Sequence, residues 1–175
     1  MNRLILMRHA KTEAWHEGID DHGRALLPRG VEDARLMAEE LVKRGWRPST
    51  ALVSTARRAR ETWRYAAPAW SGQEPVYEDD LYLASPGTLE SVLGGCEWTG
   101  ALLVIGHNPG IHEFACSLAR DGGAADDFCL ARLFEKFPTG AAALFQGEGE
   151  GAFHMAGYQL MDVIRPKDLR DGPAT

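Results

Sequence analysis

Short apolar runs recur along the chain, and polar or charged residues follow each of the main runs directly. These runs are residues 4–7, 50–53 and 101–105. Runs of this length with little polar interruption are typical of strands that are buried on both faces, as in a parallel sheet. Three further strands are predicted from apolar or alternating segments at residues 76–77, 141–145 and 158–164.

Amphipathic stretches separate these runs and predict helices. The clearest stretch begins at Pro28 and ends before Gly45, and its apolar residues recur every three or four positions. A second helix is expected to begin at a cap formed by Ser54 or Thr55 and to end at about Ala67. Two more helices are predicted at residues 88–92 and after Pro109.

The alternation of strands and helices predicts an α/β fold. We expect a three-layer α/β/α sandwich with a mostly parallel central sheet and an antiparallel strand near the end. Residues 13–27 have no helical or alternating periodicity and are predicted to form a loop. Residues 121–138 fit no element clearly, residues 147–151 predict a hairpin turn, and the tail from Arg165 is expected to be extended or frayed.

Composition narrows the class of protein. A chain of 175 residues with 45% apolar content fits a single domain covering residues 1–175. The three cysteines, Cys96, Cys116 and Cys129, have unrelated spacings, so we expect free thiols and a cytoplasmic protein without a signal peptide or membrane span. A net charge of -6 argues against nucleic acid or an anionic membrane as a partner. Any anion must therefore be bound by a local basic cluster.

Such a cluster is predicted where the three main runs end. Arg8 and His9 follow the first run, arginines follow Ser54 and Thr55, and His107 follows the third. The carboxyl ends of neighbouring parallel strands meet at one edge of a sheet, which is where ligands bind in open α/β folds. Arginine offers forked donors that suit phosphate oxygens, and histidine can either donate to an oxygen or attack phosphorus. The sequence therefore predicts a phosphate pocket.

Four segments together resemble a known family. They are residues 6–12 (LMRHAKT), 54–62 (STARRARET), 106–109 (GHNP), and the loop 21–26 (DHGRAL) that leads to Pro28. In this order and spacing they are similar to the histidine phosphatase superfamily, which has the phosphoglycerate-mutase-like fold. The loop makes the chain most similar to the small phosphohistidine phosphatases of the SixA type. The resemblance extends to about Leu118, and four linked motifs are far more specific than one Arg-His pair.

The resemblance implies roles for individual residues. His9 corresponds to the nucleophile that becomes transiently phosphorylated, with Arg8 and Arg58 as phosphate ligands and His107 as the second histidine of the pocket. Thr12 and Asn108 are further candidates for binding the phosphate. The family uses no metal or other cofactor for this chemistry. We therefore expect a metal-independent phosphatase.

The sequence does not identify a general acid. Many members of the family carry a glutamate soon after the third strand, but residues 78–84 (EDDLYLA) place no acid there securely. A phosphorus-nitrogen bond to imidazole breaks with less help than an ester bond, so the missing acid favours phosphohistidine in a protein as the substrate. Hydrolysis of a small sugar or nucleotide phosphate and a phosphate-binding module without turnover remain as alternatives. The oligomeric state stays open.

The loop that precedes the first helix contains one expected local contact. Asp21 and Arg24 are predicted to pair and brace the turn between them. On the second helix, Arg57 and Arg60 are expected to face solvent.

Overall fold

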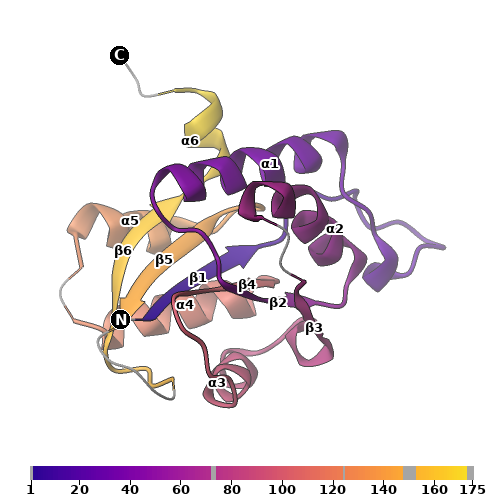
Figure 1. The fold of residues 1–175 in the computed structure, drawn as a ribbon. Coiled ribbons are helices and arrows are strands. Elements are labelled where there is room, and N and C mark those ends of the chain that lie inside the picture. The colour runs from indigo at the N-terminus through magenta and orange to yellow at the C-terminus, as the bar shows by residue number, and fades with distance from the viewer. Residues whose placement is uncertain (1, 72–73, 124, 148–152, 173–175) are drawn as a thin grey trace.

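A six-stranded sheet forms the centre of the computed structural model, which describes residues 2–71, 74–123, 125–147 and 153–172 (Figure 1). The strand order across the sheet is β3-β2-β4-β1-β5-β6. The strands are β1 (Asn2–Arg8), β2 (Thr50–Ser54), β3 (Val76–Glu78), β4 (Ala101–Gly106), β5 (Ala142–Gly147) and β6 (Tyr158–Ile164).

The first four strands in this order run parallel to one another. β1 pairs with β4, β4 with β2, and β2 with β3, whereas β5 pairs antiparallel with β1 and β6 antiparallel with β5. The predicted mostly parallel sheet with an antiparallel strand near the end is confirmed. Arg8 is in register with Gly106, and Val53 with Ile105, so β1, β4 and β2 end at the same edge.

Helices cover both faces of the sheet, which confirms the predicted sandwich (Figure 1). Alternate side chains of β1 pack on opposite faces of the sheet. Ile5 and Met7 belong to the core on one face, and Leu4 and Leu6 belong to the core on the other. The first layer consists of α1 (Pro28–Lys43) and α2 (Arg57–Ala66). The second consists of α3 (Pro86–Gly94), α4 (Gly110–Asp121) and α5 (Asp127–Glu135).

Two segments contain helices that the sequence pattern did not indicate. The unassigned residues 121–138 contain α5, whose N-terminus is capped by Asp126 through bonds from the Phe128 and Cys129 amides. Only Cys129 and Leu133 of this helix are buried, so it has little apolar periodicity to detect.

The expectation of an extended or frayed tail after Arg165 was wrong. The tail begins with α6 (Pro166–Arg170), which lies beside α1 (Figure 1). Pro166 is buried, and Arg170 pairs with the buried carboxylate of Asp33 on α1. Long-range ion pairs and one buried ring leave no periodic signal. The predicted hairpin turn at 147–151 falls largely outside the described residues.

The predicted cap of the second helix was also wrong. α2 begins at Arg57, its N-cap residue is Ala56, and no side chain caps it. Ser54 instead belongs to the edge of the sheet, where its hydroxyl contacts His107.

None of the described helices is both long enough and apolar enough to span a bilayer.

Glycine allows α1 to approach the end of β1 closely. A Cβ atom on Gly30 would lie 2.1 Å from the backbone oxygen of Lys11, two residues after His9. That oxygen also accepts a hydrogen bond of 3.0 Å from the Leu27 amide. The first turn of α1 therefore rests directly on the backbone that follows the end of β1.

We predict that Gly30→Ala destabilises the protein. Helix propensity alone would favour alanine by about 1 kcal/mol, but the clash with Lys11 requires the backbone to move. We expect the free energy of unfolding, measured by denaturant titration, to fall by about 1–3 kcal/mol. Gly94→Ala in α3 is the matched control, because a Cβ there would meet nothing within 4 Å. An unchanged stability for Gly30→Ala would contradict the close packing.

Candidate active site

The segments that follow β1 and β4, together with the first turn of α2, line a hollow of about 550 Å³ at the carboxyl edge of the parallel strands. Residues 8 and 9 reach it from β1, residues 107 and 108 follow β4, and Arg58 comes from the first turn of α2 behind β2. All six residues that the sequence nominated line this hollow: Arg8, His9, Thr12, Arg58, His107 and Asn108.

His9 lies at the centre of this arrangement and is only 5% exposed. Its Nδ1 is 2.8 Å from the carbonyl oxygen of Ala10, which can only accept a hydrogen bond, so Nδ1 carries the proton. The lone pair of Nε2 is then free. Burial, reinforced by Arg58 and Arg8, lowers the pKa of His9 to about 3, so the imidazole is neutral at physiological pH.

His107 is the second buried histidine, 3% exposed, with its ring centroid 5.2 Å from that of His9. Its Nε2 lies 2.7 Å from the Ser54 hydroxyl, which itself accepts from the Ala56 amide at 3.3 Å. Burial, then the neighbouring His9 and Arg58, lowers the pKa of His107 to about 2. Either nitrogen of the neutral His107 ring can carry the proton, because the Ser54 hydroxyl can both donate and accept.

Two arginines lie beside the histidines. Arg58 is 2% exposed and donates from Nη1 to the Asp21 backbone oxygen at 2.7 Å and from Nη2 to the Asp21 carboxylate at 3.1 Å. Arg8 donates to the carbonyl oxygen of Phe137 at 3.2 Å. Burial and the nearby Arg58 both lower the pKa of Arg8. The two like charges therefore disfavour each other in the absence of an anion.

Asp21 is the carboxylate that balances this charge. The Tyr82 hydroxyl donates to it at 2.7 Å, and Arg24 pairs with its other oxygen at 2.8 Å, which confirms the predicted brace. The Tyr82 hydrogen bond, followed by Arg58 and Arg24, lowers the pKa of Asp21 to about 2 against the opposing effect of burial. The contact between Asp21 and Arg58 was missed in the sequence, because nothing in the spacing of these residues indicates it.

Several donors of this site have no partner. In the described part of the chain, six buried side-chain nitrogen or oxygen atoms lack a hydrogen bond. Four of them belong to the nominated residues: Arg8 Nε, Arg58 Nε, His107 Nδ1 and Asn108 Oδ1. Leaving a buried donor unpaired costs about 1–3 kcal/mol, so the two unpaired guanidinium N–H groups, Arg8 Nε and Arg58 Nε, indicate a site that an anion can complete.

Thr12 and Asn108 lie in the hollow but also have structural partners. The Thr12 hydroxyl donates to the Ala25 carbonyl at 2.5 Å, and the Asn108 amide donates to the Phe137 carbonyl at 2.9 Å. Both therefore hold walls of the hollow, and a direct contact with phosphate stays a prediction.

Thr62 on α2 was also missed. It accepts from the Ala10 amide at 2.9 Å and donates to the Arg58 carbonyl at 2.7 Å, which joins the two halves of the site.

The lining of the hollow offers few candidates for a general acid. Glu13 and Asp21 are the acidic residues that line the hollow, whereas the segment expected to supply an acid contributes Leu83. One oxygen of Glu13 accepts from the Ala25 amide at 2.9 Å. Among the residues that the structure describes, no three His, Cys, Asp or Glu side chains are grouped as a metal site.

The two other arginines of α2 lie outside this hollow. Arg57 is exposed and pairs with Glu61 at 2.7 Å, and Arg60 is exposed beside Tyr77. Their expected place on a solvated helix face is confirmed.

Residues 4–92 match the model of the histidine phosphatase superfamily (branch 1). The chain belongs to this superfamily. The match includes β1 and α2, which carry Arg8, His9 and Arg58, and ends before β4.

Similar sequences and solved structures indicate which members of the superfamily this histidine phosphatase resembles. It is 38% identical over 150 residues to an uncharacterized protein of Mycobacterium tuberculosis, covering 83% of this chain and 90% of that one. A structure assigned as the phosphohistidine phosphatase SixA from Agrobacterium tumefaciens matches with a TM-score of 0.78 and 28% identity over 94% of this chain and 97% of the other. One assigned as SixA from Nakamurella matches with a TM-score of 0.78 and 27% identity, covering 94% and 96%. The chain is therefore a phosphatase with a SixA-like fold.

The lowered pKa values of His9 and His107 make a prediction about pH. Histidines in the unfolded chain titrate near about 6.5, whereas these two stay neutral down to about pH 3 and about pH 2 in the folded protein. Below about pH 6.5 the unfolded state therefore binds more protons, so stability falls as the pH falls. Each histidine contributes up to about 1.4 kcal/mol per pH unit to this slope.

The measurement is a set of denaturant titrations between pH 4.5 and about 6.5, together with an NMR titration of the imidazole nitrogens. We expect His9→Asn to have a shallower slope than the wild type. A folded-state titration of His9 near neutral pH would contradict its burial as a neutral ring.

Proposed function

We propose that this phosphatase hydrolyses phosphohistidine in proteins, with His9 as the nucleophile. The observation that carries the proposal is the set of unpaired nitrogens, Arg8 Nε, Arg58 Nε and His107 Nδ1, on residues that line the same hollow as a neutral His9 whose Nε2 is free. A neutral imidazole with one fixed tautomer is the form that can attack phosphorus. The donors suit the oxygens of a phosphoryl group.

The reaction has two steps. The Nε2 lone pair of His9 forms a bond to phosphorus while the phosphorus-nitrogen bond of the substrate breaks. The electron pair leaves with the substrate ring, which departs as a neutral imidazole because its second nitrogen carries a proton in the reactive form of phosphohistidine. The Ala10 carbonyl, 2.8 Å from Nδ1, stabilises the positive charge that develops on the His9 ring. Water then attacks phosphorus of phosphorylated His9, which releases inorganic phosphate and restores the neutral ring.

The arginines and His107 stabilise the transferring group. Most catalysis of phosphoryl transfer comes from placing positive charge and donors around the equatorial oxygens. Arg58 is held for this by Asp21, and Arg8 by the Phe137 carbonyl. These contacts hold both guanidinium groups in place beside His9.

Phosphohistidine suits the electrostatics of the hollow. An imidazole leaves from phosphorus without needing a strong acid, and Asp21, with its pKa of about 2, is ionised and has no proton to give. The SixA proteins that this chain is similar to are assigned to the same substrate class. The three free thiols support a cytoplasmic location, since disulfides are rare there.

We predict that the chain removes phosphate from a histidine-phosphorylated protein in the presence of a metal chelator. Replacing the nucleophile in His9→Ala should lower the rate by about 10³-fold or more. Acid-labile radiolabel from the phosphodonor should be trapped on the wild type and not on His9→Ala. Arg57→Gln is the matched control, because Arg57 lies on α2 next to Arg58 but is exposed and paired with Glu61. Radiolabel on His9→Ala equal to that on the wild type would refute the assignment of the nucleophile.

Glu13 favours one second candidate, the hydrolysis of a small phosphoester. It lines the hollow, and one of its oxygens is engaged with the Ala25 amide, so its other oxygen could carry a proton to an ester oxygen.

The two candidates are distinguished by Glu13→Gln, which keeps an oxygen for the Ala25 amide but removes the acid. General acid catalysis contributes about 10²-fold or more, so an ester phosphatase should lose that factor. We predict instead a change below about 3-fold on phosphohistidine, because its leaving group needs no such acid. Steady-state kinetics on a phosphohistidine peptide and on a panel of sugar and nucleotide phosphates make the comparison. Fast turnover of one ester that depends on Glu13 would establish the second candidate.

A further inference from the structure

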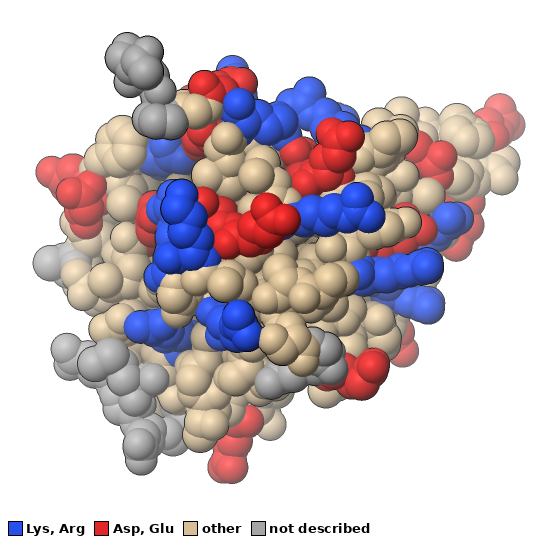
Figure 2. Space-filling model, turned by 45° about the horizontal axis from the view of Figure 1, so that its top comes forward, with Lys and Arg blue, Asp and Glu red and all other residues tan. Residues whose placement is uncertain are grey.

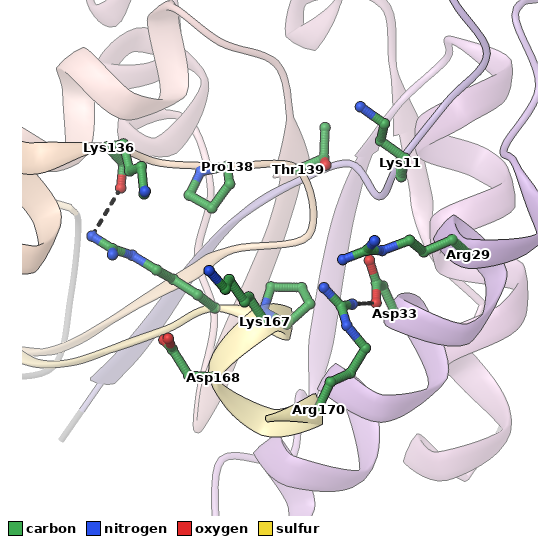
Figure 3. Close-up of a pocket in the computed structure, with 11 residues that line it drawn as sticks. Lys11, Arg29, Asp33, Lys136, Pro138, Thr139, Lys167, Asp168 and Arg170 are labelled. Atoms are coloured by element: carbon green, nitrogen blue, oxygen red, sulfur yellow. Dashed lines mark hydrogen bonds and ion pairs between the residues drawn. The ribbon is translucent and has the colours of Figure 1, made fainter. Parts of the chain in front are cut away.

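A second hollow, of about 490 Å³, adjoins the catalytic one and has a markedly basic lining (Figure 3). Six of its eleven lining residues are lysine or arginine, and two are aspartate. We call it the basic hollow and define it by its cations: Lys11, Arg29, Lys136, Arg165, Lys167 and Arg170. An excess of four positive charges in one hollow contrasts with the net charge of -6 for the whole chain.

The two aspartates in the lining do not neutralise the free cations. Asp33 pairs with Arg170, and Asp168 pairs with Arg132, which lies outside the lining. Within the described ranges, Lys11, Arg29 and Lys167 form no ion pair, and all three are exposed. In Figure 3 the side chains of Arg29 and Lys167 extend from α1 and α6 into the same space. Three unpaired cations therefore line it.

The basic hollow is built onto the catalytic residues. Lys11 and Thr139 line both hollows. The Gly140 amide, next to Thr139, donates to the His9 carbonyl at 2.9 Å, and the Lys11 oxygen lies against Gly30, next to Arg29. A molecule whose phosphoryl group sits at His9 is thus positioned to reach these cations with another part of itself.

The unpaired cations of the basic hollow come from separate elements. Lys11 follows β1, Arg29 belongs to α1, and Lys167 belongs to α6. Figure 2 shows lysine and arginine side chains interspersed with acidic ones across this side of the molecule, not a continuous basic face. The arrangement suits several carboxylates along one segment better than a single compact anion or a long polyanion.

We propose that the basic hollow binds an acidic segment of the protein that carries the phosphohistidine. This inference rests on the proposed function and deepens it, because it assigns the recognition of the substrate protein to residues that do not take part in the phosphoryl transfer. The protein has an overall negative charge, so an acidic partner is repelled at long range. The basic hollow supplies a local attraction that orients the partner with its phosphohistidine toward His9.

The test compares two phosphohistidine peptides of equal length. One has glutamates on both sides of the phosphohistidine, and the other has glutamines at the same positions. For the wild type at low ionic strength we expect kcat/KM to be at least about 5-fold higher for the glutamate peptide, the factor that one or two exposed ion pairs supply. This ratio should fall toward one as salt is added.

The variant Arg29→Glu/Lys167→Glu should lower the glutamate-to-glutamine ratio to one or below. Arg35→Glu is the matched control, because Arg35 is an exposed arginine on α1 outside the basic hollow, and its ratio should equal that of the wild type. Should the double glutamate variant fail to fold by circular dichroism, Arg29→Gln/Lys167→Gln provides the same comparison without new negative charge. A wild-type ratio of one, or a ratio that survives in the double variant, would overturn the proposal.

The proposal and the function on which it rests fail in different ways. Turnover of neither peptide would refute the phosphohistidine substrate. Binding of the unphosphorylated glutamate peptide, followed by fluorescence anisotropy, still tests the basic hollow in that case. Binding of this peptide that is lost in the double variant and kept in Arg35→Glu would support the basic hollow as the site for an acidic segment. Competition by inorganic phosphate with no binding of the glutamate peptide would instead make the basic hollow a site for a small anion and overturn the acidic segment.

Discussion

The proximity of two arginines at one edge of the sheet, the buried Arg58 and the half-buried Arg8, is the constraint on which the site depends. The charges of Arg8 and Arg58 repel each other, and the low exposure of Arg58 prevents water from screening this repulsion. Asp21 offsets part of this charge, and Tyr82 holds its carboxylate in the ionised form. Burial, reinforced by the remaining positive potential, keeps both histidines neutral, and the same potential attracts an anion. The arginines thus favour both the neutral form of the proposed nucleophile and the binding of its target.

Much of this could be predicted from the sequence because the residues involved leave strong local signals. Strands β1 and β4 are buried on both faces, so they appear as unbroken apolar runs, and the parallel register brings the residues after them together. His9 and His107 follow from that rule without any knowledge of the loops. The spacing of the cysteines and the composition of the chain only exclude classes of protein and partner.

The parts that could not be predicted depend on contacts between distant residues. Asp21 reaches Arg58 across 37 positions, and α6 is held by the ion pair between Arg170 and Asp33. Neither contact has a periodic pattern. The prediction for Ser54 failed for a different reason. A serine just before a helix is usually interpreted as its N-cap, but here the Ser54 hydroxyl contacts the ring of His107. The sequence pattern indicated the local role and not this contact with a residue distant in the chain.

The place of β1 in the sheet has a consequence for how the protein is made. β1 lies between β4 and β5, which follow it by about a hundred residues or more, so the strand that carries the proposed nucleophile is synthesised before both of its neighbours in the sheet. The carbonyl of Phe137 and the amide of Gly140 that hold Arg8 and His9 come later still than β4. A nascent chain on the ribosome therefore exposes His9 long before the residues that surround it in the fold exist. The site is assembled only after residues 137–140 have been synthesised.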